Sequence, residues 1–275
     1  MNKLTFFAWG DTHFGYNQRF AEDDLRYGII EQINNLPGWP YPAQIGGVVE
    51  KPDFVVHCGD IIDGEQSLPT EEAYYDYFVA RLASLHYEVL GNHDLAPPFL
   101  KQFIRKYGGK SYSFDLKGFH FISLAGEYDQ YEVGHIPEAG LDFIKSDLSR
   151  IDKSTPVVIF THTRIDRLKN GKVVLQLLRR RQVKLIISAH RHKPAISELG
   201  TITCIDIGHC RNHPIDPEYG RSFYVVRLTG KRITALPWRW DYKEWECGRG
   251  WANPEIAQQR FMLDNFLHIS GKLRK

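Results

Sequence analysis

The chain has 275 residues, of which 43% are hydrophobic and 25% are charged, and its net charge is +2. These values are ordinary for a soluble globular protein and fit one large domain. The small net charge makes nucleic acid a possible but not a favoured partner. No apolar run approaches membrane-spanning length, and residues 4–9 are too short an apolar run for an export signal.

The four cysteines show no Cys-x-x-Cys spacing, and Cys58 falls inside a predicted buried strand. Such usage is typical of reduced thiols, so we expect a cytoplasmic protein. No membrane partner is expected, and the oligomeric state stays open.

Strands alternate with helices up to about residue 190, and strands dominate after it. We predict strands at 3–9, 54–58, 87–90, 111–115, 119–125, 157–160, 183–187, 195–199, 201–207, 223–228 and 232–236. Helices are predicted at 20–36, 70–85, 137–151, about 171–181 and 254–269. The pattern indicates a single domain over 1–275, with a core of about 1–237 and a Trp-rich C-terminal extension, 238–275, that ends in the last helix. The irregular insertion at 37–52 has no assigned role.

Five of the predicted strands end in side chains that bind metals. Because the carboxyl ends of strands in open α/β sheets meet at one edge, these side chains are expected to form one site. Any one of them alone is better explained as a turn or surface residue. Together they offer more donors than one catalytic ion needs and suit two ions that share the central carboxylate. The seven donors are Asp11, His13, Asp60, Asn92, His162, His190 and His192.

The ordered motifs carry a resemblance to a known family. They are Asp11-Thr12-His13, Gly59–Asp63, Gly91–Asp94, His162 and Ala189–His192. This set, which spans residues 10 to 192, resembles the calcineurin-like metallophosphoesterase superfamily. The resemblance implies an α/β fold, a four-layer αββα sandwich of two mixed sheets.

The resemblance also implies a role for each donor. In the first metal site it places Asp11, His13 and His192. In the second it places Asn92, His162 and His190, with Asp60 bridging both. The two divalent ions would be Mn, Fe or Zn. His93 would be the catalytic proton donor facing the substrate phosphoryl group, and Asp94 would orient its ring.

Two positions depart from the family pattern. Ala189 stands where a glycine usually precedes the last His-x-His, and His162 is flanked by Thr161 and Thr163. Neither change removes a ligand. Asp63 occupies the point at which purple acid phosphatases carry a metal-binding tyrosine, so the chain is not expected to belong to that group.

The expected activity is metal-dependent hydrolysis of a small phosphate ester, by a phosphodiesterase or a phosphatase. A metal-bridging hydroxide would be the nucleophile and His93 the proton donor. The Gly-Asn-His-Asp motif is similar to that of cyclic-nucleotide and glycerophosphodiester phosphodiesterases. Substrate contacts are hardest to predict, and the candidates are Arg164, Arg211, Tyr16 and His209.

Two alternatives stay open. The opening motif, residues 11–16, looks like that of the Mre11/SbcD DNA nucleases, although those chains are longer and this one lacks a strongly basic composition. A non-catalytic scaffold of the same fold, such as the retromer subunit that resembles these enzymes, is the alternative of another class. A scaffold predicts lost ligands or a lost proton donor, and none is lost here.

Overall fold

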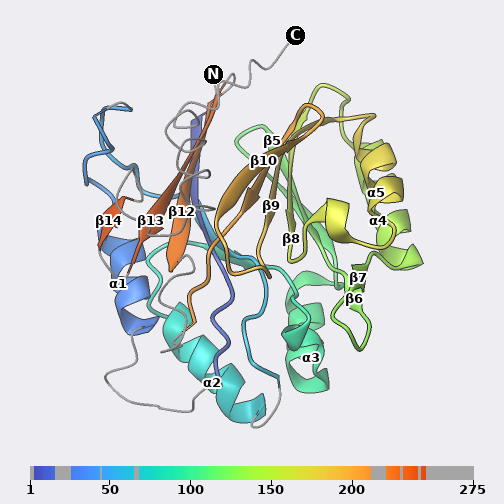
Figure 1. The fold of residues 1–275 in the computed structure, drawn as a ribbon, viewed down its shortest axis with the longest axis horizontal. Helices are drawn as coiled ribbons and strands as arrows, with labels where there is room; N and C mark the ends of the chain where they lie inside the picture. The colour runs from blue at the N-terminus through green and yellow to red at the C-terminus, as the bar shows by residue number, and fades with distance from the viewer. Residues whose placement is uncertain are drawn as a thin grey trace, which may run out of the picture.

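The computed structural model describes residues 3–15, 26–43, 45–64, 68–211, 221–229, 232–240 and 243–245. Two sheets face each other at the centre of the molecule, and helices cover their outer faces (Figure 1). Tyr16 and the predicted helix 254–269 lie outside the described residues.

The first sheet mixes parallel and antiparallel pairs. Its order is β14 (Glu244–Trp245), β13 (Arg232–Arg239), β12 (Ser222–Thr229), β1 (Lys3–Trp9), β2 (Phe54–His57) and β3 (His86–Glu88). β1, β2 and β3 run parallel, and the other pairs are antiparallel. The carboxyl ends of β1, β2 and β3 therefore share one edge, where the predicted Asp and Asn donors follow.

The second sheet is also mixed. Its order is β10 (Ala195–Leu199), β11 (Ile202–Asp206), β9 (Gln182–Ser188), β8 (Pro156–Thr161), β5 (Phe119–Leu124) and β4 (Tyr112–Leu116). The strands β11, β9, β8 and β5 are parallel neighbours, with antiparallel strands at both edges. A separate hairpin pairs β6 (Glu127–Tyr128) with β7 (Gly134–His135).

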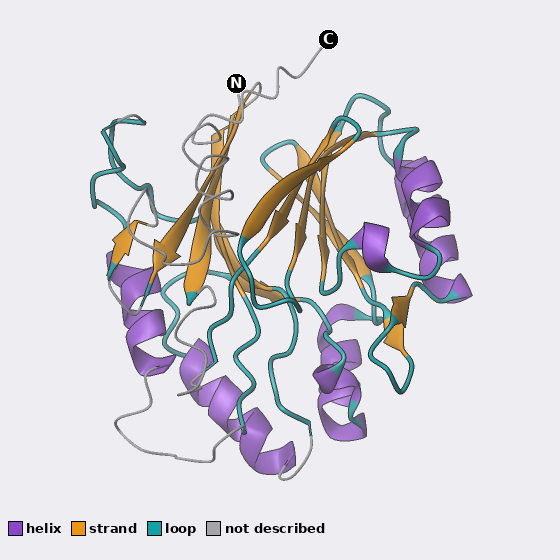
Figure 2. Cartoon of the chain, in the orientation of Figure 1, coloured by secondary structure: helices purple, strands orange, loops and turns teal. Residues whose placement is uncertain are grey.

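Five helices are described, together with short 3₁₀ turns at His93–Leu95 and Ile165–Arg167. On one side of the molecule lie α1 (Arg26–Asn35) and α2 (Leu68–Val79), and α4 (Glu138–Arg150) and α5 (Gly171–Leu178) lie on the opposite side (Figure 2). The remaining helix, α3 (Pro97–Tyr107), follows the 3₁₀ turn that starts at His93.

Three hydrophobic cores fill the spaces between the four layers. Alternate side chains of β1 serve two of them, because successive side chains of a strand point to opposite faces. Phe7 packs in the core that includes α1 and α2, while Phe6 packs between the sheets, against Phe160 of β8. A third core, around Ile159, joins β8 to α4 and α5. The predicted four-layer αββα sandwich of two mixed sheets is confirmed.

The structure adds elements that the sequence did not reveal. α3 was not predicted, although Phe99 and Phe103 share a buried face and Pro97 and Pro98 suit the first helical turn. The hairpin β6–β7 occupies a stretch that was expected to be a loop. β13 continues to Arg239, so Trp238 belongs to the sheet rather than to an extension beyond it.

Aromatic contacts join the 37–52 insertion to the end of the described chain. The Trp245 indole donates a hydrogen bond from Nε1 to the carbonyl of Pro40 at 3.0 Å and packs beside Tyr41. Trp39 packs edge-to-face on Trp238, with ring centroids 5.4 Å apart. The insertion therefore covers the outer edge of the first sheet. Within the described residues, no helix is both long and apolar enough to cross a membrane.

A buried histidine links the second sheet to α4. His120 of β5 donates to Asp147 of α4 at 2.7 Å and to Asp115 of β4 at 2.8 Å. Burial opposes charging of the ring, but the hydrogen bonds and charges of the two carboxylates outweigh it and raise the pKa of His120. The same contacts lower the pKa of Asp147, against the effect of its burial. The charged pair of His120 and Asp147 therefore contributes its full stabilisation at a pH above the unfolded Asp pKa of about 3.9 and below the unfolded His pKa of about 6.5.

We predict that His120→Gln lowers the free energy of unfolding by about 1–3 kcal/mol at a pH between these values. The deficit should shrink as pH rises through the raised pKa of the folded histidine, because the wild type then loses the charge. Denaturant unfolding of both proteins across pH measures it, with His135→Gln as a control. A deficit that stays constant with pH would contradict a charged His120.

Candidate metal centre

The predicted ligands sit on strained backbone at the ends of their strands. Asp11, His13, Asp60, His190 and His192 all adopt the left-handed conformation, with φ between 44° and 70°. For residues other than glycine this conformation costs about 1–3 kcal/mol each and persists only where the surroundings enforce it. Its concentration at these five positions marks the strand ends as a functional site.

Two glycines allow the ligand loops to approach closely. A Cβ added at Gly91 would lie 2.2 Å from Oδ1 of Asp60, and one at Gly59 would lie 2.5 Å from Nδ1 of His162. Gly59 also has a φ of 95°. A side chain at either position would displace a ligand, so space requires both glycines, and backbone conformation also requires Gly59.

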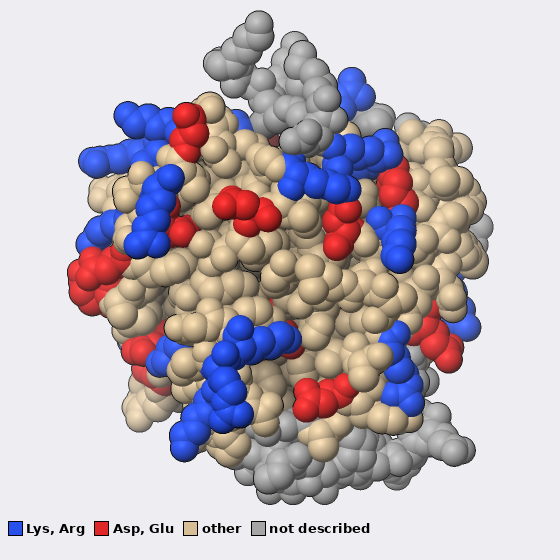
Figure 3. Space-filling model, turned by 180° about the vertical axis from the view of Figure 1, so that it is seen from behind, with Lys and Arg blue, Asp and Glu red and all other residues tan. Residues whose placement is uncertain are grey.

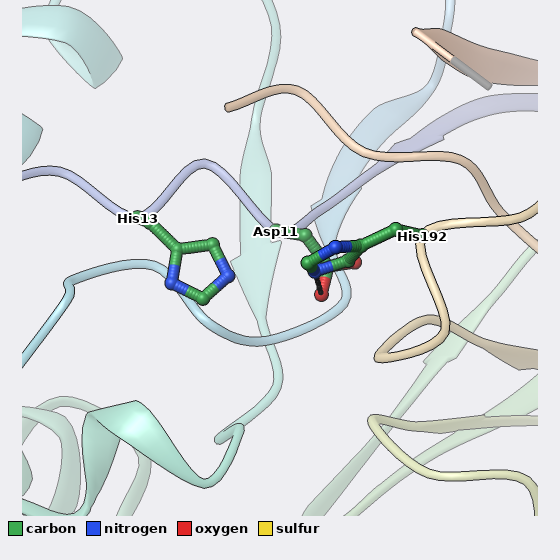
Figure 4. Close-up of side chains that lie close together, drawn as sticks. All are labelled: Asp11, His13 and His192. Carbon is green, nitrogen blue, oxygen red and sulfur yellow. Dashed lines mark ion pairs between the residues drawn. The ribbon is translucent and has the colours of Figure 1, made fainter. Parts of the chain in front are cut away.

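Asp11, His13 and His192 form one group, from opposite ends of the motif series (Figure 4). His192 Nε2 lies 3.3 Å from Asp11 Oδ1. His13 places Nδ1 3.3 Å from Asp63 Oδ1, so Nδ1 donates there, while its buried Nε2 has no hydrogen-bond partner and lies 3.6 Å from Asp60 Oδ2. An oriented imidazole with one buried nitrogen left unpaired is the arrangement of a metal ligand.

Asp60, His162 and His190 form an adjacent group, which Asn92 joins. His162 donates from Nδ1 to the Cys58 carbonyl at 2.8 Å, so in the neutral ring its Nε2 carries the lone pair. That Nε2 lies 3.1 Å from Asp60 Oδ2, 3.1 Å from Asn92 Oδ1 and 3.2 Å from His190 Nδ1. Lone pairs that converge in this way repel one another unless a cation lies among them, so these residues fit a metal ion.

The titration of the site shows the same need for positive charge. Burial favours the neutral form of Asp60, yet His162 and His13 outweigh it and lower the Asp60 pKa. Burial likewise opposes the charged form of His162, but Asp60 and Asp11 raise its pKa to about 9. The buried carboxylates thus hold a proton on a neighbouring ring, and a metal ion would displace that proton.

His93 borders the pocket beside these groups. Its ring centroid lies 4.7 Å from that of His13, and its Nδ1 donates to the Asp63 carbonyl at 2.6 Å. Burial lowers the His93 pKa, but the charge of Asp60 and the bond to Asp63 outweigh burial and raise it. The histidine is therefore held by Asp63, whose carboxylate also contacts His13.

Asp94 has a different task from the predicted one. Its buried carboxylate accepts hydrogen bonds from the backbone N–H groups of Ile61, Ile62 and Gly91 at 2.8, 3.0 and 2.8 Å. The His93 ring donates from Nδ1 to the Asp63 carbonyl rather than to Asp94, so the prediction that Asp94 orients this ring is not met. Asp94 instead ties the loop after β2 to the loop after β3, which fixes Asp60 relative to Asn92.

The structure describes three of the four predicted substrate contacts, and only one of these three lines the pocket. Arg211 lines the pocket, a cavity of about 270 Å³ over the metal ligands. Arg164 does not line it, because its guanidinium is held by Asp166 and Asp206 at 2.9 Å. His209 is fully buried, and its ring packs 5.3 Å from that of His192. The fourth candidate, Tyr16, lies outside the described residues. The pocket is lined by His13, Asp60, Asp63, Asn92, His93, Glu132, His190, His192 and Arg211.

Arg26, which the sequence analysis did not single out, supports the first ligand loop. Its side chain is buried, and its Nη1 donates to the carbonyls of Thr12 and His13, each at 3.0 Å. The guanidinium also lies 4.6 Å from the centre of the Phe14 ring. A buried cation with backbone acceptors on both sides of a ligand stabilises the strained loop at His13. In the sequence, Arg26 lies at the start of a helix, and nothing in that position indicates a contact with the loop at His13.

Replacement of Arg26 by Met should leave both carbonyls unsatisfied and lower the free energy of unfolding of the metal-free protein by about 2–4 kcal/mol. Metal affinity should fall as well, because His13 loses its fixed position. Denaturant unfolding and metal titration measure the two effects. Arg180→Met, at an exposed position, is the control, and equal losses in the two variants would contradict the role of Arg26.

Comparisons with known proteins agree with this geometry. The family model for calcineurin-like phosphoesterases matches residues 4–194. A dimetal phosphatase from Danio rerio superposes with a TM-score of 0.63 at 17% identity, over 86% of this chain and 96% of that one. GAP50, an anchor in the inner membrane complex of Plasmodium, superposes with a TM-score of 0.57 at 16% identity, over 89% of this chain and 87% of that one. No curated protein sequence matches the chain.

At these identities the two structures show the fold alone, and one of them is a phosphatase while the other is an anchor. The family model spans well over half of the chain and includes every predicted ligand. The chain therefore belongs to the calcineurin-like phosphoesterase family.

Proposed function

We propose that the protein hydrolyses small phosphate esters with two divalent ions of the Mn, Fe or Zn kind. The observation that carries the proposal is that the seven predicted donors come together in two adjacent groups, which His13 and Asp60 join. The Asp60 carboxylate groups with His162 and His190 on one side and with His13 and His93 on the other, and His13 also belongs to the group of Asp11 and His192. Imidazole donors favour these transition metals over Mg²⁺. A scaffold has no need to keep five strained ligand positions.

When bound, the two ions supply a water of lowered pKa and polarise the phosphoryl oxygens. Asp60 holds the two groups together, and Asp94 fixes the spacing of the loops beneath them. His93 borders the same cavity, and its Nδ1 is engaged by the Asp63 carbonyl. Its Nε2 is then the ring atom that can give a proton to the leaving oxygen. The raised pKa of His93 favours the protonated ring that this role needs.

A small ester suits the site better than a nucleic acid does. The cavity of about 270 Å³ is at the small end of ligand pockets. On the face drawn in Figure 3, basic and acidic side chains are interspersed rather than gathered into a basic track. A long polyanion would need such a track, and this face shows none. We propose a cytoplasmic location on the strength of the buried free thiols of Cys58, Cys204 and Cys210.

Replacement of Asp60 by Asn tests the shared ligand. Asn tolerates the left-handed backbone at this position, so the fold should survive. The neutral amide binds metal more weakly, and we predict that the variant loses at least one of two bound ions and most of its turnover. Elemental analysis after dialysis measures the metal content per chain. Asp142→Asn, on the exposed face of α4, is the control. Two ions and near-normal turnover at limiting metal would refute the bridging role.

Replacement of His93 by Ala separates proton donation from metal binding. The variant should keep both ions but hydrolyse esters with basic leaving groups about 10²–10⁴-fold more slowly. Esters of acidic nitrophenols should be affected far less, because those leaving groups depart without a proton. The measurement is kcat/KM across a series of graded leaving-group pKa, with metal content checked in each sample. A uniform loss across the series would indicate a positioning role instead.

A further inference from the structure

The hairpin β6–β7 is built to present one acidic side chain at the pocket. Its tip is closed by Asp129, whose Oδ1 accepts the backbone N–H groups of Tyr131 and Val133 at 2.8 and 3.0 Å. Oδ2 of the same carboxylate pairs with Lys169 at 2.6 Å, which anchors the tip to the loop before α5. The tip therefore has a defined conformation despite its exposure.

The base of the hairpin is attached to the second ligand group. Tyr128 shares a hydrogen bond of 3.1 Å with Thr163 Oγ1, next to His162. Its ring centroid lies 6.4 Å from that of His162 and 6.2 Å from that of His190. A Cβ at Gly134 would lie 3.0 Å from the Tyr128 ring, so the two strands of the hairpin close on this tyrosine. The tip is consequently held at a fixed place relative to the metal ligands.

Glu132 stands at this tip. It lines the same pocket as His93, although the two residues are far apart in sequence. Its backbone is left-handed, with a φ of 58°, and its N–H donates to the Asp129 carbonyl at 3.0 Å. Glutamate gains nothing from this conformation, which glycine or asparagine would adopt at lower cost. A strained carboxylate beside a site that attracts anions calls for an explanation in terms of the ligand.

We propose that Glu132 selects singly charged phosphodiesters over doubly charged phosphomonoesters, so that the substrate class of this site is a phosphodiester. Two divalent ions outweigh the charges of Asp11, Asp60 and Asp63 and leave the centre positive, and Arg211 adds a further cation to the lining. Such a centre alone binds a dianion more tightly than a monoanion. A fixed carboxylate in the same pocket repels the dianion more, which shifts the preference toward the monoanion. The inference rests on the proposed function, because it concerns the same pocket.

The test compares two substrates that share a leaving group and differ by one charge. These are p-nitrophenyl phosphate and its methyl ester, each hydrolysed by Mn²⁺-loaded protein at a pH where the monoester is a dianion. Glu132→Gln should raise kcat/KM for the monoester about three- to tenfold relative to the diester, a modest factor because solvent screens an exposed carboxylate. Glu132→Asp keeps the charge and should keep the selectivity. Glu198→Gln, at an exposed position on β10, controls for the loss of one negative charge.

A second measurement does not depend on turnover. Calorimetric binding of phenylphosphonate and of its monomethyl ester to the same proteins gives the ratio of the two dissociation constants. Glu132→Gln should strengthen binding of the dianion relative to binding of the monoanion by a similar factor. Unchanged ratios in both experiments would overturn the inference and leave the proposed function standing. A shifted binding ratio with no hydrolysis of either ester would support charge selection and count against the proposed function. Failure of both ligands to bind would overturn both.

Discussion

Around the Asp60 carboxylate, atoms that can only accept hydrogen bonds are forced together, and much of the structure exists to hold them there. His162 donates to the Cys58 carbonyl from Nδ1, so its other nitrogen can meet Asp60 favourably only through a proton or a metal ion. Asn92 Oδ1 and His190 Nδ1 lie 3.1 and 3.2 Å from that nitrogen of His162. Such a cluster is unfavourable without positive charge among its members. The left-handed ligands, the close glycines and the buried Arg26 all serve to maintain it against that repulsion.

The two sheets contribute to the centre jointly. Asp11, Asp60 and Asn92 follow strands of the first sheet, whereas His162 and His190 follow strands of the second. The distance between Asp60 and His162 is consequently set by how the sheets pack. Aromatic rings control that packing, as in the edge-to-face contact of Phe6 with Phe160 at 5.6 Å. Folding and site formation therefore depend on the same apolar interface, and a metal ion bound across it adds stability to the folded state.

The sequence predicted the parts of the site that depend on strand periodicity and motif order, and missed those that depend on side-chain direction. The strand ends could be predicted because short apolar runs stop where each buried strand ends, and the seven predicted donors lie just beyond those ends. Asp94 was misjudged, because adjacency to His93 in sequence says nothing of which backbone groups its oxygens reach. Arg164 was proposed as a phosphate contact before Asp166 and Asp206 were known to surround it.

α3 was missed because its two prolines suggest a loop until the spacing of Phe99 and Phe103 is considered. Trp238 was separated from the core because Trp39, on which its ring packs, is distant in sequence.

Fold likeness alone leaves the activity open, because both a phosphatase and an anchor share this architecture. The proposed hydrolytic function therefore depends on whether the Asp60 carboxylate binds two ions. Anomalous diffraction from crystals of the Mn²⁺-loaded protein tests this most directly. We predict two anomalous peaks about 3.5–4 Å apart, one beside Asp11, His13 and His192 and the other beside Asn92, His162 and His190, with Asp60 in contact with both. A single peak at full metal saturation, or two peaks that do not share Asp60, would contradict it.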